Sequence, residues 1–98
     1  VTFTVIVPDN NDEVFITGNQ PELASWNPKQ LKLKNTSDFE RKISLKIHLP
    51  ALFKFTRGSW DKEALVKGIE GIPNLRIEIE DSNEVKYIIE DWKDKITN

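Results

Sequence analysis

The hydrophobic residues of this chain recur with a period of two along most of its length. In residues 1–7 they occupy every odd position while Thr2 and Thr4 are polar, which is the pattern of a half-buried β-strand, and Pro8 ends the segment. Residues 13–18 follow a polar turn, are rich in β-branched and aromatic side chains, and end at Gly18. They predict a second strand in hairpin-like succession with the first.

The alternation stops at residues 19–29, which contain two prolines and read mostly as loop. Pro21 favours the first position of a helix, so residues 21–23 are suited to one short helical turn. Alternation returns in residues 31–34 and 39–49 and ends at Pro50. In 39–49 the pattern predicts inward positions at Ile43, Leu45, Ile47 and Leu49, and outward positions at Lys42, Ser44, Lys46 and His48.

Residues 52–56 and 75–80 again alternate, and about eighteen residues with three glycines and no clean period separate them. A loop of that length in a small domain is usually functional, and a short helix at residues 62–66 is one alternative within it. The tail, residues 84–96, fits both a helical and a strand period. We take it as a strand because every segment upstream has period two. The prediction is an all-β, immunoglobulin-like antiparallel β-sandwich of about seven or eight strands.

Length and composition limit the number of domains and the kinds of partner that this chain can have. Ninety-eight residues are enough for one hydrophobic core, so we expect residues 1–98 to form a single domain. With 38% hydrophobic and 31% charged residues the chain should fold. The net charge is −2 with both signs interspersed, which predicts no basic face and hence no nucleic acid partner. No apolar run approaches the roughly 20 residues that span a bilayer, so we expect no membrane partner, and we expect a monomer.

The sequence excludes several kinds of chemical site and gives only weak signals for others. The chain has no cysteine, which excludes disulfides and thiolate zinc sites, and His48 is its only histidine, so a catalytic triad cannot be assembled. Asp9, Asn11 and Glu13 have the spacing of calcium ligands, but Val14 stands where that loop needs glycine. Carboxylate pairs such as 61 with 63 and 90 with 91 read as solvated surface. We predict no catalytic residue, no metal site and no cofactor.

The aromatic residues are more informative. Core packing explains the phenylalanines of the predicted strands, which are Phe3, Phe15, Phe53 and Phe55. Trp26 and Trp60 instead lie in polar loops, where each either covers an edge of the core or offers a flat platform for a ligand. Sugar rings suit such a platform because their C–H faces pack on aromatic rings. Lys54 and Asn74 would then hydrogen-bond the sugar hydroxyls.

Four segments carry a resemblance to a known family. They are VFITGNQPELASWNP at 14–28, FKFTRGSW at 53–60, IPN at 72–74 and VKYIIEDW at 85–92. In order and spacing these segments resemble the starch-binding domains of carbohydrate-binding module family 20. The resemblance covers essentially the whole chain. It implies an immunoglobulin-like sandwich that binds α-1,4-linked glucans without cleaving them.

The resemblance also implies a surface site. Trp26 and Trp60 match the family's two stacking tryptophans, and Lys54 and Asn74 match its hydrogen-bonding residues, while Trp92 matches a structural tryptophan of the last strand. In many members the second tryptophan lies further along its loop than Trp60 does. Leu75 also stands where arginine is usual. The family's second site uses tyrosines, and the corresponding stretches at 9–12 and 34–39 have none, so we expect that site to be absent.

Two functions are therefore weighed. The first is a non-catalytic module that binds starch, glycogen or a maltooligosaccharide and is linked to a catalytic or other domain. The alternative is a structural spacer of the same ancestry, which predicts that Trp26 and Trp60 are buried or far apart. The absence of methionine suggests a processed product or a domain cut from a longer protein. By analogy a starch ligand favours a secreted, periplasmic or cell-surface location, and glycogen would reverse that inference.

Overall fold

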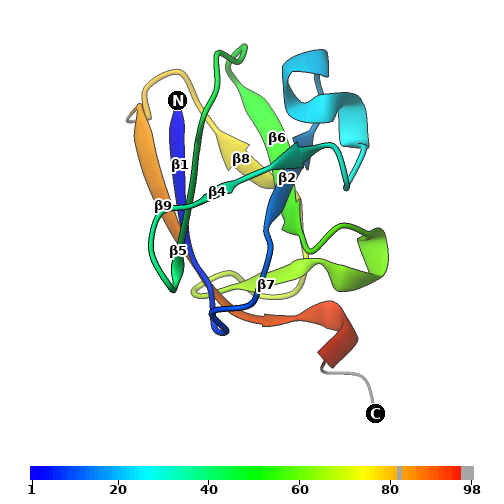
Figure 1. Cartoon of the computed structure of the whole chain (residues 1–98). Helices are drawn as coiled ribbons and strands as arrows, with labels where there is room; N and C mark the ends of the chain where they lie inside the picture. Colours follow the sequence, from blue (N-terminus) through cyan, green and yellow to red (C-terminus); the bar gives the residue numbers. More distant parts are fainter. Residues whose placement is uncertain (82, 96–98) are drawn as a thin grey trace.

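The computed structural model describes residues 1–81 and 83–95, and its regular structure is almost entirely β (Figure 1). Its strands are β1 (Thr2–Ile6), β2 (Phe15–Gly18), β3 (Leu31–Lys32), β4 (Lys34–Asn35), β5 (Glu40–Ser44), β6 (Ala51–Thr56), β7 (Ala64–Val66), β8 (Leu75–Ile77) and β9 (Glu84–Trp92). Three short 3₁₀ helices complete the set: η1 (Pro21–Trp26), η2 (Trp60–Lys62) and η3 (Lys93–Lys95). None of the described helices has the length and apolar character needed to cross a membrane.

The strands form two sheets. One has the order β4-β5-β1-β9-β7 and the other has the order β3-β2-β6-β8. Neighbouring strands are antiparallel except for β1 and β9, which are parallel. β3 and β4 lie on one segment that passes from the second sheet to the first, with buried Leu33 between them. The predicted all-β sandwich is confirmed.

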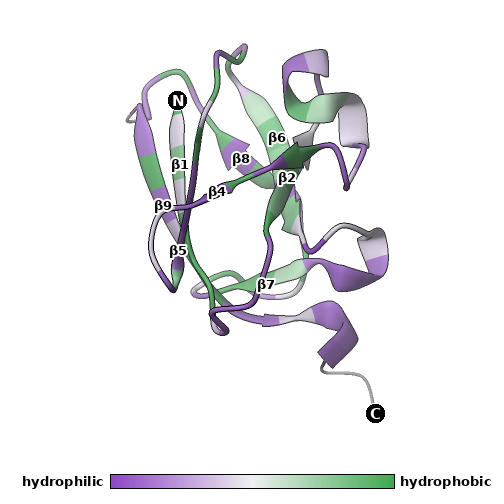
Figure 2. Cartoon of the chain, in the orientation of Figure 1, coloured by the Kyte–Doolittle hydropathy of each residue, from purple (hydrophilic) through white to green (hydrophobic). Residues whose placement is uncertain are grey.

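The core lies between the two sheets and is built by the inward half of each alternating pattern. Phe3, Val5 and Val7 are buried, as the period-two pattern of residues 1–7 predicts. Phe3 and Phe53 meet edge to face with ring centroids 5.1 Å apart, and Phe53 and Tyr87 do so at 5.7 Å. In Figure 2 hydrophobic positions alternate with pale, near-neutral ones along β1 and with hydrophilic ones in the first part of β9.

Two expectations for the strands need correction. Residues 62–66 do not form a helix of their own: Lys62 is the last residue of η2, and residues 64–66 form β7, in which Ala64 and Val66 are buried against β9. Phe15 is only half-buried, because Val14 and Ile16 on either side of it take the inward positions of that strand. It therefore belongs to the outer face of β2 and not to the core.

Two other expectations are confirmed. The tail is strand β9, and it ends in 3₁₀ helix η3 before residues 96–98, which lie outside the described part of the chain. The inward set predicted for 39–49 does pack against the core, although only part of that stretch is strand, since β5 ends at Ser44.

The end of the sandwich opposite the amino terminus is closed by a buried polar cluster. Trp92 is fully buried, as expected for a structural tryptophan, and its indole Nε1–H donates to Asp12 Oδ2 at 2.8 Å. The guanidinium of Arg57 lies 5.1 Å from the centroid of the Trp92 ring, on its face. Arg41 is buried beside it and donates to the backbone carbonyls of Asn10 and Asp12, each at 2.9 Å. These bonds join the 9–12 turn to the carboxyl end of β9.

Candidate functional site

The outward face of β2 and β6 carries the first part of the candidate site. Thr17 of β2 pairs with Lys54 of β6, so both side chains point away from the core. On the other side of β6, Phe53 pairs with Leu75. Asn74 directly precedes β8, and the Lys54 ammonium donates to the carbonyl of Ile72, two residues before Asn74. The structure thus places two of the predicted site residues, 54 and 74, on adjoining segments.

Trp26 is presented by an unusual turn at the end of η1. Ala24, Ser25 and Trp26 have φ values of 60°, 45° and 66°, which places three consecutive non-glycine residues in the left-handed region. Each such residue costs about 1–2 kcal/mol. The turn is held by backbone hydrogen bonds, including Ser25 N–H to the Gln20 carbonyl at 3.0 Å. Burial of Leu23 and a bond from the Thr17 hydroxyl to the Leu23 carbonyl at 3.2 Å anchor it on β2.

Gly18 makes this anchoring possible. A Cβ atom at that position would lie 2.3 Å from the Leu52 carbonyl oxygen and 2.7 Å from Leu23 Cδ1. Such distances are far inside van der Waals contact, so any larger residue would displace η1 or β6. The glycine that ends the second predicted strand therefore lets the Trp26 turn pack closely on the sheet.

Trp60 lies in η2, directly after the turn that follows β6, and its ring lies beside that of Trp26. The two ring centroids are 6.2 Å apart and the planes are inclined by 45°. Trp60 is 38% exposed and Trp26 is half-buried, so the pair remains open to solvent. The hydroxyl of Thr56 links the two loops, since it donates to the Pro28 carbonyl at 2.8 Å and accepts from the Gly58 N–H at 3.0 Å. Figure 1 shows η1 and η2 on the same side of the four-stranded sheet.

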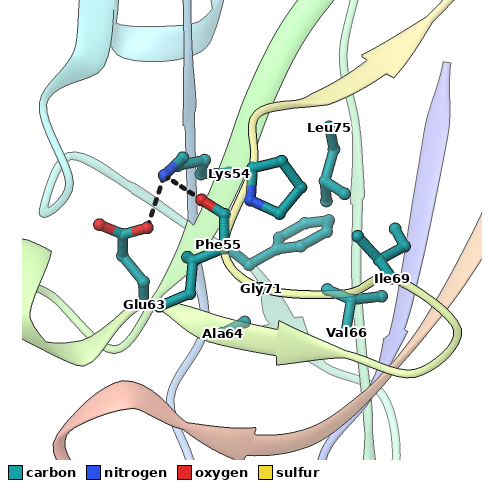
Figure 3. A pocket seen from close by; sticks show the side chains of 10 residues that line it. Lys54, Phe55, Glu63, Ala64, Val66, Ile69, Gly71 and Leu75 are labelled. Atoms are coloured by element: carbon teal, nitrogen blue, oxygen red, sulfur yellow. Dashed lines mark hydrogen bonds and ion pairs between the residues drawn. The ribbon is translucent and has the colours of Figure 1, made fainter.

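The ammonium group of Lys54 already has two partners within the protein. It donates to Glu63 Oε2 at 2.7 Å and to the Ile72 carbonyl at 3.0 Å, as Figure 3 shows. The side chains of Lys54 and Glu63 are only 17% and 10% exposed. A lysine ammonium has three donors, so one remains for a ligand. The pair ties β6 to the start of β7 and to the 69–74 segment that carries Asn74.

Glu63 was not found by sequence reasoning, which took it for part of a solvated surface. Its local sequence resembles that of exposed Asp61 two residues earlier, and its partner is nine residues away on another strand. Only the correct assignment of β7 would have placed it beside β6. The carboxyl of Asp61 stays exposed, and a hydrogen bond from Ser59 lowers its pKa.

The site is a surface and not a deep pocket. The cavity beneath Lys54 is lined mainly by aliphatic residues of β7, β8 and the loop between them and measures about 10 Å³. That is room for about one water molecule and excludes a sugar ring. Asn74 is exposed, and no hydrogen bond of its side chain is found within residues 1–81 and 83–95. In that same part of the chain no group of three metal-ligating side chains is placed to hold an ion.

His48 is a surface residue. Its side chain is 84% exposed, and its Nε2 lies 3.6 Å from the carboxylate of Glu22. Among the described residues, the two predicted stacking residues are thus brought together at one place and the two predicted polar residues at another. Glu63 connects the two places, because it directly follows η2, which carries Trp60, and binds Lys54.

Comparison with known proteins identifies the family. Residues 1–89 match the family model of the starch binding domain, which is most of the chain. The chain belongs to the starch-binding domain family. This family, carbohydrate-binding module family 20, has a β-sandwich fold and is non-catalytic, in agreement with the architecture described above.

One relative of this starch-binding domain is an amylopullulanase from Thermoanaerobacter thermohydrosulfuricus. It is 33% identical over 104 aligned positions, which cover 96% of this chain. The chain corresponds to only 7% of the length of that protein. No solved structure matches the chain significantly.

Proposed function

We propose that this starch-binding domain binds an α-1,4-linked glucan at the Trp26–Trp60 pair and does not cleave it. The observation that carries the proposal is the pair itself: two tryptophan rings 6.2 Å apart from separate loops, one of them 38% exposed. Apolar faces of successive glucose units would pack on the two rings. The 45° inclination suits the curved chain that α-1,4 linkages produce better than the flat chain of a β-1,4 glucan.

Polar contacts would orient the bound chain. The remaining donor of Lys54 and the side-chain amide of Asn74 are the groups available on the neighbouring part of the face. The strained Ala24–Trp26 turn supports a binding role, because such strain persists where the surrounding structure enforces it and clusters at functional sites.

A hydrolytic role is not favoured by the carboxyl groups near the tryptophans. Glu63 is paired with Lys54, and the pKa of exposed Asp61 is lowered, whereas a general acid needs a carboxyl whose pKa is raised. The alternative function, a spacer that has lost binding, predicts tryptophans that are buried or far apart. The close approach of the Trp26 and Trp60 rings, with Trp60 38% exposed, argues against it.

The domain is proposed to act as one module of a longer protein, with a catalytic or other domain as its covalent partner. A shallow surface binds weakly, and tethering to a second domain raises the effective concentration of both at the polymer. The isolated residues 1–98 should unfold in a single cooperative urea transition. Separate transitions for the two sheets would contradict the single-domain assignment.

Calorimetric titration with maltoheptaose, followed in parallel by tryptophan fluorescence, tests the proposal. We expect saturable binding that is lost in Trp26→Ala and in Trp60→Ala. Phe39→Ala is the matched control, because Phe39 is an aromatic residue of similar exposure, 48%, away from the site. Cellohexaose should bind much more weakly. Absence of binding by the wild type at millimolar maltoheptaose would leave the spacer as the better assignment.

A further inference from the structure

The outer face of the five-stranded sheet carries a row of lysines from three separate parts of the sequence. Lys34 of β4 pairs with Lys42 of β5, Lys42 pairs with Thr4 of β1, and Thr4 pairs with Lys86 of β9. Paired residues point to the same face of a sheet, and here that face is opposite to the one on which Phe3 is buried. Strand register thus gathers into one row lysines that are interspersed with acidic residues along the chain.

The row borders a shallow hollow at the edge of the sandwich. The hollow has a volume of about 350 Å³ and is lined by Lys32, Lys34, Thr36, Lys42, Ile43 and Ser44. That volume lies at the lower end of the range for small-molecule sites. None of these lining residues is itself a carboxylate, but the hydroxyl of Thr36 donates to Glu40 Oε1 at 2.8 Å. Lys32 forms an ion pair with Glu13, whereas Lys34 and Lys42 have no ion pair within the described part of the chain.

The pairing of Lys34 with Lys42 is itself unfavourable in the free domain. Like charges directly opposite each other on neighbouring strands repel, and strands lie about 4.8 Å apart. An anion bound between the two ammonium groups would remove that repulsion and gain charge-assisted hydrogen bonds. The arrangement is thus better suited to a bound anion than to the empty state.

We propose that this lysine hollow binds a phosphate monoester carried on a glucan chain. A monoester has nearly two negative charges at neutral pH and three acceptor oxygens, which match the unpaired ammonium groups of residues 34 and 42. Glu40 and Glu84 occupy the rows on either side of the lysines on the same face. They favour a compact dianion over an extended polyanion or an anionic membrane. The glucan as carrier rests on the proposed function.

A nuclear magnetic resonance titration of the ¹⁵N-labelled domain tests the hollow directly. Glucose 6-phosphate should shift the amide signals of residues 32–36 and 42–44, and glucose should not. In the double variant Lys34→Gln/Lys42→Gln the affinity should fall about tenfold at low salt, since each exposed charge contributes modestly. Lys67→Gln, at an exposed lysine outside the hollow, is the control. Unchanged signals in the wild type, or equal affinity in the double variant, would overturn the proposal.

A binding assay with amylopectin, phosphorylated or enzymatically dephosphorylated, tests the source of the ester. The wild type should prefer the phosphorylated polymer, and the double lysine variant should bind both alike. Trp60→Ala should weaken binding to the phosphorylated and to the dephosphorylated polymer alike. Loss of the glucan site therefore lowers both affinities, whereas loss of the lysine hollow removes only the preference for the phosphorylated polymer. Equal wild-type affinity for the two polymers would overturn the glucan as carrier. Binding to anionic vesicles without any response to monoesters would overturn the hollow as a monoester site.

Discussion

The buried ion pair between Lys54 and Glu63 offers the sharpest test of how this face is built. The two charges are 2.7 Å apart and their side chains are 17% and 10% exposed. At an effective dielectric constant of about 20, their attraction is about 6 kcal/mol before desolvation is subtracted. Removing one partner of a buried pair costs about 3–5 kcal/mol, because the other charge stays buried without compensation. Glu63→Gln keeps an oxygen acceptor for Lys54, so we expect about 2–3 kcal/mol less stability to unfolding.

The coupling between the two residues separates this effect from simple loss of packing. Lys54→Met, Glu63→Gln and the double variant form a double-mutant cycle, measured by urea unfolding. We expect the double variant to lose less stability than the sum of the singles, with a coupling of about 1–3 kcal/mol. The control is Glu78→Gln, which breaks an exposed pair with Arg76 and should cost at most about 1 kcal/mol.

The same variants can also be compared by their affinity for maltoheptaose. Glu63 is not expected to contact a glucan, but it fixes the ammonium of Lys54 and, with the Ile72 carbonyl, the segment before Asn74. Glu63→Gln should therefore weaken maltoheptaose binding while leaving stacking on Trp26 and Trp60 possible. Strictly additive effects on stability, within about 0.5 kcal/mol, would refute the reasoning, since they would show that the pair does not act as one unit.

Three further predictions follow from single contacts. Gly18→Ala should lower the free energy of unfolding in urea by about 1–3 kcal/mol, because the new Cβ would collide with Leu23, which supports the Ala24–Trp26 turn. The same variant should bind glucan more weakly, and unchanged affinity would show that this packing does not position Trp26. Trp92→Phe should lose about 2–3 kcal/mol, measured by circular dichroism during urea unfolding, because the hydrogen bond to buried Asp12 disappears; a loss below about 0.5 kcal/mol would contradict it. Burial raises the pKa of Tyr87, so the folded state holds this proton more tightly than the unfolded chain, whose pKa is about 10. The neutral Tyr87 side chain therefore contributes its full stabilisation below about pH 10, and this stabilisation is lost as the pH rises through the pKa of the folded state. The melting temperature should fall less steeply above about pH 10 in Tyr87→Phe than in the wild type.

Much of the fold could be predicted because each strand carries its own signal. The alternation in residues 1–7 identified both the strand and its buried face, Pro8 follows that strand and Gly18 ends the next one, whereas β5 ends at Ser44, before the predicted boundary at Pro50. The other failures occurred where the local pattern was short or symmetrical. Residues 64–66 are too few to show a period, and in Val14-Phe15-Ile16 three apolar side chains compete for two inward positions.

The candidate site was predicted residue by residue, but its assembly was not. The loop tryptophans and Lys54 stood out by residue type and position, and the family resemblance grouped them with Asn74. The 6.2 Å approach of the tryptophan rings depends on a left-handed turn at Ala24–Trp26 and on the bond that joins Thr56 to Pro28. Neither has a sequence signal, because both arise from contacts between segments far apart in the chain.

By itself the sequence determined the strand pattern, the absence of cysteine chemistry and the presence of tryptophans in polar loops, since these depend on residue type and local period. Tertiary structure decided which charges meet. The register of β4, β5, β1 and β9 aligns lysines that are interspersed with acidic residues along the chain, and β7 brings Glu63 to Lys54. The physical reason is that side-chain direction follows from neighbours within a strand, whereas side-chain partners follow from pairing between strands.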